Sequence, residues 1–150
     1  MNENNEIVGI FKLRPRYGEV DRMGYVYHAN YVSYCHQART ELLRQFGIDD
    51  STLESQGIML PVISMNLRYL KPACYDELLS IKTTISEMPS TRFSFHFEIR
   101  NETGERICTA ESSVVFVDSH SRKPMRVPEF IIQALENHLT KQYAETNCFN

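Results

Sequence analysis

One short segment near the N-terminus carries the residue types that could act on an activated carbonyl group. The acid Asp21 stands three residues before Gly24, and His28 follows four residues later. An apolar, helix-patterned segment begins at Tyr31. Backbone N–H groups at the start of a helix have no partner within it, and the helix dipole makes that end positive. A carboxylate beside such donors could attack a carbonyl carbon, or activate water, while the donors hold the oxyanion that results.

Asp21 is the candidate catalytic acid because two opposing effects could keep it ionised yet poorly hydrated. Burial raises the pKa of a carboxyl group, whereas donors at a helix N-terminus lower it. A carboxylate in that state is a better nucleophile or base than one in bulk water. Taken without their neighbours, Glu19 and Asp21 would be two solvated loop acids. Within the segment, Asp21 is expected to be the working acid and Glu19 to be structural.

A central helix is predicted directly after this segment. Apolar residues recur there at spacings of three and four, which places them on one helical face. They are Tyr31, Cys35, Ala38, Leu42 and Phe46. Gly47 is a typical stop signal, so a helix of about 18 residues is expected. Its length of about 27 Å would let it cross a small sheet.

Two further helices are predicted. Residues 51–56 form a short one, with Ser51 as its N-cap, Glu54 at the capping-box position and Gly57 at its end. Pro128 opens the last helix. Its apolar residues include Ile131, Ile132, Leu135 and Leu139. Residues 143–150 are expected to be a polar tail.

The rest of the chain is predicted to be mostly strand. Apolar and polar residues alternate over 63–69, 79–85 and 93–99, and a strand is expected from residue 7 to about residue 14. A turn at 101–104 leads into a strand over 107–117. One long helix followed by hairpin-linked strands indicates an α+β fold with an antiparallel sheet. Because no repeat or linker interrupts the 150 residues, a single domain over 1–150 is expected, with its core at about 7–130.

Composition excludes several classes of protein. The net charge of −3 gives no nucleic-acid footprint, and no apolar run is long enough to predict membrane insertion. Residues 1–6 are polar and acidic, unlike a signal peptide. The scattered histidines give no metal-ligand pattern, and the four cysteines lack a CxxC spacing, so reduced thiols in a cytoplasmic protein are expected. The cysteines are Cys35, Cys74, Cys108 and Cys148.

Two motifs carry a resemblance to a known family. They read Asp21-x-x-Gly24-x-Val26-Tyr27-His28-Ala29-Asn30-Tyr31 and Ala38-Arg39-Thr40-Glu41. This order resembles the signature of the hotdog-fold thioesterases of the 4-hydroxybenzoyl-CoA thioesterase family, and is most similar to the acyl-CoA thioesterase branch associated with the Tol-Pal system. Later segments agree, and the resemblance covers residues 7 to about 130. These segments are Leu60-Pro-Val62, Arg68 to Ala73, Tyr75-Asp-Glu77 and Phe95 to Arg100.

The resemblance implies a fold, an activity and an assembly. In that family an antiparallel sheet wraps around one long helix, and the enzymes hydrolyse an acyl-CoA thioester to the free acid and coenzyme A. Dimers join their sheets edge to edge and often pair into homotetramers, with the site between two subunits. No metal or redox cofactor is used, since coenzyme A is part of the substrate.

Carried over by position, the resemblance also implies roles for individual residues. Asp21 becomes the nucleophile or general base, and the backbone N–H at or near His28 polarises the thioester carbonyl. Tyr17 and the His28 side chain would support the site. At one position the chain departs from the pattern, because many members have a glutamate on the helix where this chain has His36. His36 either replaces that glutamate or shows that it is dispensable here.

Other residues are candidates for substrate binding. Gly24, Tyr27 and Tyr31 belong to the motif, although a turn glycine and two core aromatics are the alternative interpretation. Lys71 and Arg92 could meet the phosphates of coenzyme A. Arg39 lies at the edge of the apolar face of the helix, so its charge should need a partner. An ion pair is expected there, with Asp49, Asp50 or a carboxylate of residues 19–21.

Two other functions remain open at this point. A hydratase or dehydratase could share the fold, but no acid lies between Tyr31 and Thr40, and the Pro-Gly-rich segment typical of fatty-acid dehydratases is missing. A non-catalytic acyl-CoA-binding protein is the second alternative, which an intact Asp21 motif disfavours. The acyl group is not fixed by the sequence, and acyl carrier protein could replace coenzyme A.

Overall fold

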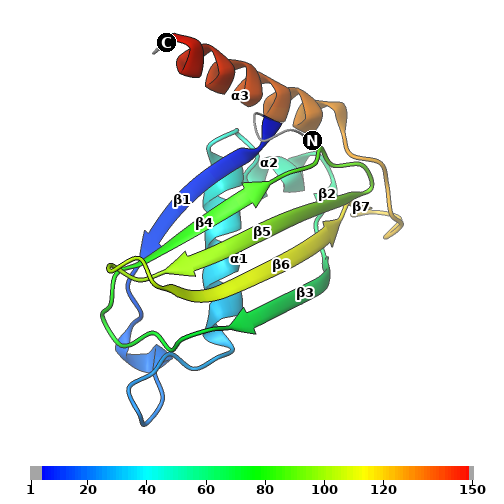
Figure 1. Ribbon diagram of the computed structural model, residues 1–150. Coiled ribbons are helices and arrows are strands. Elements are labelled where there is room, and N and C mark those ends of the chain that lie inside the picture. The colour runs from blue at the N-terminus through cyan, green and yellow to red at the C-terminus, as the bar shows by residue number, and fades with distance from the viewer. Residues whose placement is uncertain (1–4, 149–150) are drawn as a thin grey trace.

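The fold is built on a five-stranded antiparallel sheet, which Figure 1 shows in a computed structural model that describes residues 5–148. The strand order is β1-β4-β5-β6-β3, so β1 and β3 form the two edges. The strands are β1 (Ile7–Leu13), β3 (Val62–Tyr69), β4 (Leu79–Ile85), β5 (Arg92–Arg100) and β6 (Arg106–Val115). The sheet curves around the helix α1 (Asn30–Arg44), which confirms the predicted α+β architecture.

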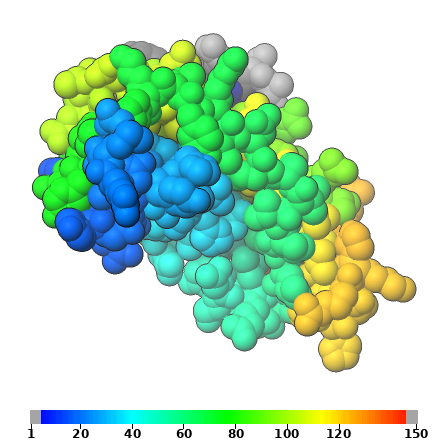
Figure 2. All heavy atoms as spheres, turned by 90° about the horizontal axis from the view of Figure 1, so that it is seen from below, coloured from blue at the N-terminus to red at the C-terminus, as the bar shows by residue number. Residues whose placement is uncertain are grey.

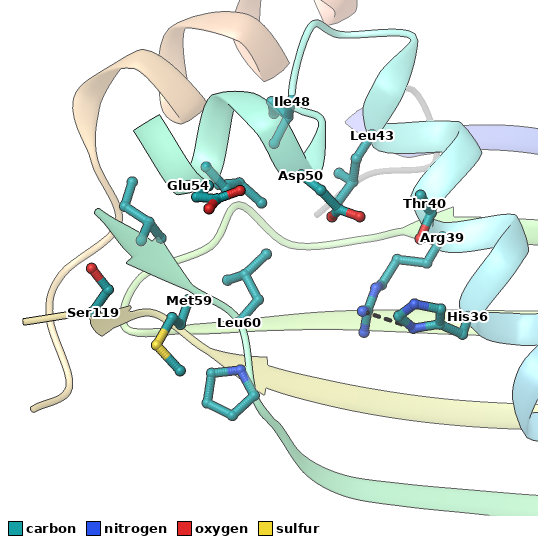
Figure 3. A pocket seen from close by; sticks show the side chains of 13 residues that line it. His36, Arg39, Thr40, Leu43, Ile48, Asp50, Glu54, Met59, Leu60 and Ser119 are labelled. Carbon is teal, nitrogen blue, oxygen red and sulfur yellow. Dashed lines mark hydrogen bonds between the residues drawn. The ribbon is translucent and has the colours of Figure 1, made fainter. Parts of the chain in front are cut away.

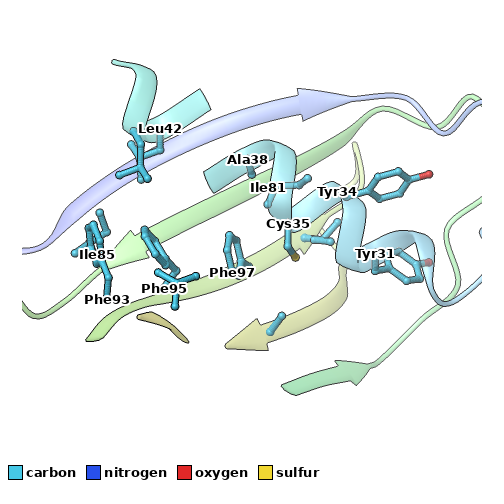
Figure 4. Packing of buried hydrophobic residues seen from close by; sticks show 14 of the residues in the cluster. Tyr31, Tyr34, Cys35, Ala38, Leu42, Ile81, Ile85, Phe93, Phe95 and Phe97 are labelled. Atoms are coloured by element: carbon cyan, nitrogen blue, oxygen red, sulfur yellow. The ribbon is translucent and has the colours of Figure 1, made fainter. Parts of the chain in front are cut away.

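The central helix buries the predicted face against the sheet. Figure 4 shows its side chains directed at the apolar rows of β4 and β5. From the helix these are Tyr31, Tyr34, Cys35, Ala38 and Leu42, and from the strands they include Ile81, Ile85, Phe93, Phe95 and Phe97. Apolar burial of this kind is the main favourable term in folding. It fixes the helix, and so the start of the helix, relative to the sheet.

The helix is shorter than predicted. It has 15 residues and ends at Arg44. Gly47 adopts a left-handed φ of +78°, and its N–H donates to the carbonyl of Arg44 at 3.0 Å, which turns the chain away. Phe46 therefore lies beyond the helix, where its ring contacts that of His138 at a centroid distance of 4.5 Å.

Strand β1 approaches α1 very closely at Gly9. A Cβ atom at this position would lie 2.6 Å from Cδ1 of Leu42, which is 2% exposed. The absence of a side chain at residue 9 lets the edge strand reach the helix. A side chain at residue 9 would therefore force the end of Leu42 to shift.

Short elements join these parts. They are the 3₁₀ helix η2 (Tyr17–Glu19), the helix α2 (Asp50–Ser55) and the two-stranded ribbon of β2 (Ile58–Met59) and β7 (Val117–Asp118). The predicted strand over 107–117 is thus divided between β6 and β7. The prediction of Ser51 as the cap of α2 is wrong, because Asp49 has extended backbone and its Oδ1 accepts the N–H of Thr52 at 2.8 Å. An aspartate is as good an N-cap as a serine, and the earlier one takes the position.

The last helix, α3 (Glu129–Cys148), begins directly after Pro128 as predicted. It buries Ile131 and Leu135, and it lies at the end of the sheet where β1 starts (Figure 1). The predicted polar tail is wrong as far as Cys148, since the helix continues through it, and residues 149–150 lie outside the described residues. Within residues 5–148, no helix is both long and apolar enough to cross a membrane.

Candidate active site

The loop that carries Asp21 is a tight, hydrogen-bonded turn. The N–H of Asp21 donates to the carbonyl of Tyr25 at 2.7 Å, and the N–H of Gly24 donates to the carbonyl of Asp21 at 3.0 Å. Gly24 has a φ of +80°, a conformation that strongly favours glycine. The N–H of Val26 then donates to the carbonyl of Ala73 at 2.8 Å, which fastens the turn to the segment after β3.

The Asp21 carboxylate is held by only one of its two oxygens. Its Oδ1 accepts the N–H of Met23 at 2.9 Å and that of Tyr25 at 3.2 Å. Its Oδ2 has no hydrogen-bond partner among residues 5–148. Fixing one oxygen while leaving the other free is a suitable arrangement for a nucleophile or a base.

This arrangement corrects two expectations for Asp21. The donors that hold its carboxylate come from its own turn and not from the start of the helix. The side chain is also exposed in the single chain, whereas a poorly hydrated carboxylate was expected. Because Met23 and Tyr25 belong to the same turn as Asp21, their N–H groups occupy Oδ1.

The start of α1 presents two free backbone donors. The N–H groups of Asn30, Tyr31 and Val32 donate to the carbonyls three residues earlier, at 2.9, 3.4 and 3.3 Å. These short-range bonds move the unsatisfied N–H groups back along the chain. In the described part of the chain, the amides of His28 and Ala29 have no acceptor. They therefore form the positive end of the helix.

A pocket of about 300 Å³ brings the turn and the helix start together. Its lining residues are Asp21, Tyr25, Val26, His28, Tyr31, Tyr69, Leu70, Lys71 and Pro72. The space-filling view in Figure 2 shows the blue N-terminal loop and the start of α1 beside the green chain that follows β3. Four of the residues singled out in the sequence, Asp21, His28, Tyr31 and Lys71, thus share one pocket.

Aromatic residues fix one wall of this pocket, which we call the Asp21 pocket. The hydroxyl of Tyr69 donates to the carbonyl of His28 at 3.2 Å, and the hydroxyl of Tyr31 accepts the N–H of Ala73 at 3.2 Å. The Tyr31 and Tyr69 rings lie 5.7 Å apart between centroids. Burial raises the pKa of Tyr31, so its hydroxyl stays neutral. The wall is therefore fixed by hydrogen bonds at residues 28 and 73.

Glu19 occupies a structural position beside the site. Its Oε1 accepts the N–H of Arg16 at 2.7 Å and the hydroxyl of Tyr34 at 3.1 Å. Its main-chain carbonyl accepts the N–H of Tyr27 and the side-chain amide of Asn30. Glu19 therefore connects the loop to α1 instead of facing the Asp21 pocket.

Several candidate residues lie away from this pocket. Tyr17 is 82% exposed and packs its ring edge-on against Tyr75, at 6.0 Å between centroids. Tyr27 is half exposed and packs on the His28 ring at 4.5 Å. Arg92 begins β5, at the end of the strand that lies far from the pocket. The separation is about 23 Å along the sheet.

Lys71, in contrast, lines the pocket, and it also forms an ion pair with Glu105.

Tyr25, Leu70 and Pro72 also line the pocket, although no pattern in the sequence singles them out. Tyr25 is brought there by an isolated antiparallel bridge between Tyr25 and Cys74. Residues 49 positions apart are joined by that bridge, and no local pattern signals it. A bridge of this kind is visible only in the folded chain.

A second cavity, of about 480 Å³, lies between α1, α2 and β2 (Figure 3). His36 and Arg39 project into it from α1, and Nη2 of Arg39 lies 3.1 Å from Nδ1 of His36. The predicted ion pair of Arg39 is wrong, because no carboxylate of residues 5–148 lies within 4.0 Å of its guanidinium. Asp49 is occupied as the cap of α2, and Asp50 lines the cavity at longer range.

The described chain has three free cysteine thiols and no cluster of side chains that could bind a metal ion. Cys35, Cys74 and Cys108 are free, and burial raises the pKa of Cys35 to about 12 and that of Cys108 to about 11. Residues 5–148 contain no group of three or more His, Cys, Asp or Glu side chains arranged to hold a metal ion.

Comparison with known proteins finds similarity to thioesterases, both in a family model and in individual relatives. The family model of the thioesterase-like superfamily matches residues 15–135. The chain is 36% identical to YneP of Bacillus subtilis over 115 residues, covering 77% of this chain and 83% of that protein. It is 35% identical over 120 residues to the acyl-CoA thioester hydrolase YbgC of Escherichia coli, covering 80% and 90% of the two chains.

The fold is also similar to that of a thioesterase whose structure has been solved. The DHNA-CoA thioesterase of Staphylococcus aureus is similar with a TM-score of 0.76 and 28% sequence identity, covering 95% of this chain and 93% of that one. The sheet wrapped around a central helix is therefore shared along almost the whole length of both proteins.

Proposed function

The chain belongs to the thioesterase-like superfamily, and from that membership we infer that it hydrolyses acyl-CoA thioesters in the Asp21 pocket. The enzyme is a thioester hydrolase: water is the second substrate, and the products are a free acid and coenzyme A. The single observation that carries the assignment of the site is that Asp21, whose carboxylate has one free oxygen, and His28, whose amide has no acceptor, line the same pocket.

In the proposed reaction, Oδ2 of Asp21 acts on the thioester while Oδ1 stays bound to the amides of Met23 and Tyr25. As nucleophile, it would add to the carbonyl carbon and form a mixed anhydride, which water then hydrolyses. As general base, it would take a proton from the attacking water. Both routes use the same free oxygen.

The amides of His28 and Ala29 are the proposed donors to the carbonyl oxygen as it becomes an oxyanion. They support this role because they have no other acceptor in the described chain and lie at the positive end of α1. The thiolate of coenzyme A is a good leaving group. The site therefore needs no strong acid beside the sulfur, and the proposed reaction uses neither a metal nor a redox cofactor.

We also propose that the enzyme is at least a homodimer, joined at β3, and that dimers pair into tetramers. Strand β3 is a sheet edge, and it exposes Val62 by 52% and Ile63 by 47%. An unpaired apolar edge strand is suited to pairing with a second copy. Tyr69 of β3 lines the Asp21 pocket, so a partner on this edge would shield the exposed carboxylate. Gel filtration with light scattering measures the mass in solution.

The free thiols support a proposed location in the cytoplasm. Cys35 and Cys108 are buried and Cys74 is exposed, and all three are unpaired. Exposed free thiols are typical of proteins that work in a reducing compartment. Cell fractionation with an antibody against the chain tests this directly.

The test of the activity is thiol release from a panel of acyl-CoAs of increasing length, with aromatic members included. The native chain should release coenzyme A from at least one of them. Asp21→Asn removes the charge at almost constant shape and should lower kcat by about 10²- to 10⁴-fold. Glu136→Gln is the matched acid-to-amide control on the exposed face of α3, and it should leave the rate unchanged.

Two results would overturn this proposal. The first is native-level hydrolysis by a correctly folded Asp21→Asn variant, which would remove the carboxylate from the reaction. The second is tight binding of acyl-CoA with no turnover across the panel, which would make the chain a binding protein.

A further inference from the structure

A buried arginine without an anionic partner lies in a cavity next to the Asp21 pocket. Arg39 is only 8% exposed, and its guanidinium lies over the Phe95 ring at 5.9 Å from the centroid. Of its five N–H donors, one meets Nδ1 of His36 at 3.1 Å, and no carboxylate in residues 5–148 lies within 4.0 Å. A buried cation is costly unless it is paired and hydrogen-bonded. The remaining donors are therefore available to a ligand.

The cavity itself is small and mostly apolar. Its volume is about 160 Å³, and it lies between α1 and β3. Its lining residues are Val32, Cys35, His36, Arg39, Val62, Met65, Phe97 and Ser112. A cavity of about this size holds a benzene molecule in other proteins, so it suits a group of five or six carbons. Arg39 and His36 supply the charge and the polar ring among apolar walls.

The cavity follows the Asp21 pocket along the same helix. Tyr31 lines the Asp21 pocket, and Val32 and Cys35 line the small cavity. Helical side chains lean toward the N-terminus, and the guanidinium of Arg39 reaches back to His36. The level of residue 36 is about 7.5 Å along the axis from Tyr31. An acyl group whose thioester lies in the Asp21 pocket could therefore place its far end at Arg39.

The charges nearby favour an anion on this side of Arg39. Asp50 and Glu54 line the larger cavity on the other side of the Arg39–His36 pair, and neither lines the small one. The ring nitrogen of His36 accepts from the guanidinium, so the ring adds no positive charge in that state. The charge of Asp50 also acts on Arg39, but from the larger cavity, so Arg39 is the charged side chain among the residues that line the small one. A guanidinium binds a carboxylate through two parallel hydrogen bonds, the strongest pairing available to it.

We propose that Arg39 selects acyl-CoAs whose acyl group has five or six carbons and carries a carboxylate at its far end, with His36 positioning the guanidinium. This inference rests on the proposed thioesterase activity and names its substrate class. The substrates are monothioesters of short dicarboxylic acids.

The test compares acyl-CoAs that differ only at the far end. Adipoyl-CoA and hexanoyl-CoA form the six-carbon pair, and glutaryl-CoA and pentanoyl-CoA form the five-carbon pair, each corrected for uncatalysed hydrolysis. The native chain should show a kcat/KM about tenfold to a hundredfold higher for the dicarboxylic member, the range of a charged hydrogen bond. Arg39→Gln should bring that ratio to about one or below while it still hydrolyses hexanoyl-CoA.

Matched variants keep the result interpretable. Arg44→Gln removes an exposed arginine of the same helix, paired with Glu41, and should leave the ratio unchanged. Arg39→Lys keeps the charge but not the paired geometry, so it should give an intermediate ratio, and it replaces Arg39→Gln if that variant does not fold.

Three outcomes would overturn the inference. One is a native ratio of one or less, with hexanoyl-CoA hydrolysed well; the thioesterase activity would then stand without the carboxylate selection. The second is a ratio that persists in both Arg39 variants. The third is 6-hydroxyhexanoyl-CoA hydrolysed as fast as adipoyl-CoA, which would make the selection one for a hydrogen-bonding group and not for charge. If no acyl-CoA is hydrolysed at all, the proposed function fails and the inference fails with it.

Discussion

The hydroxyl of Tyr34, in α1, donates to Oε1 of Glu19 in the loop before Asp21, at 3.1 Å. The same oxygen accepts the N–H of Arg16, and the Glu19 carbonyl accepts the N–H of Tyr27. Burial is the main cause that raises the pKa of Tyr34, and the Glu19 charge adds to it, so the hydroxyl remains a donor. This contact ties the loop that carries the carboxylate to the helix that carries the free amides.

Tyr34→Phe should therefore loosen the loop without touching the pocket. Loss of one hydrogen bond should lower the free energy of unfolding by about 0.5–1.5 kcal/mol. A fall of several-fold in kcat/KM should accompany it, because Asp21 would be held less firmly. Urea unfolding and thiol-release kinetics measure the two effects, with Tyr143→Phe as the exposed control. An unchanged kcat/KM would show that the loop keeps its position without Tyr34.

His28→Ala separates the backbone of residue 28 from its side chain. The amide is the proposed oxyanion donor and remains in the variant, so kcat should fall by less than about tenfold. A general acid removed from the reaction would instead cost about 10²- to 10⁴-fold. The comparison is made at saturating acyl-CoA. A loss in the larger range would move the catalytic role from the amide to the ring.

Local periodicity explains how much of the fold could be predicted from the sequence. The face of α1 from Tyr31 to Leu42 and the alternating rows of β4 and β5 are buried as predicted, because apolar spacing directly reports which side of an element meets the core. The family motif likewise pointed to the segment from Asp21 to Tyr31, which lines the pocket at three of its positions singled out in advance.

Contacts between distant segments explain what could not be predicted. Tyr25 reaches the pocket through its bridge to Cys74, 49 positions along the chain. The fold likewise brings no carboxylate of residues 5–148 within 4.0 Å of Arg39, whose partner is His36 of the same helix. Arg92 is separated from the pocket by the length of β5. This separation could not be predicted, because the sequence of a strand does not give its direction in the sheet. Such facts depend on how the strands are ordered, and strand order leaves no mark on local spacing.

Gly9→Ala tests the close approach of β1 to α1. The new Cβ would lie 2.6 Å from Cδ1 of Leu42, so the end of this buried side chain must shift. Overpacking of this kind costs about 1–3 kcal/mol, so the variant should melt several degrees below the native chain. Gly18→Ala is the control, because nothing lies within 4 Å of a Cβ there. Adding Leu42→Val should recover part of the loss if this contact is the cause.

His36→Gln should change how stability depends on pH. Burial is the main cause that lowers the pKa of His36 in the folded chain, and the Arg39 charge adds to it, while Asp50 opposes both. In the unfolded chain the pKa returns to about 6.5. As the pH falls through 6.5, the unfolded chain therefore binds a proton that the folded chain does not, and stability is lost. Above that pH neither state binds it, and the contribution is fully present.

Glutamine can still accept a hydrogen bond from Arg39 but does not titrate, so it isolates this effect. Melting temperatures of the native chain and of His36→Gln should run in parallel from pH 8 to pH 7. Below about pH 6.5 the native curve should fall more steeply than that of the variant, because only the native chain takes up a proton at residue 36 on unfolding. Two curves that stay parallel down to pH 5 would mean that His36 titrates alike in both states. The neutral ring would then not be what holds the Arg39 guanidinium in place.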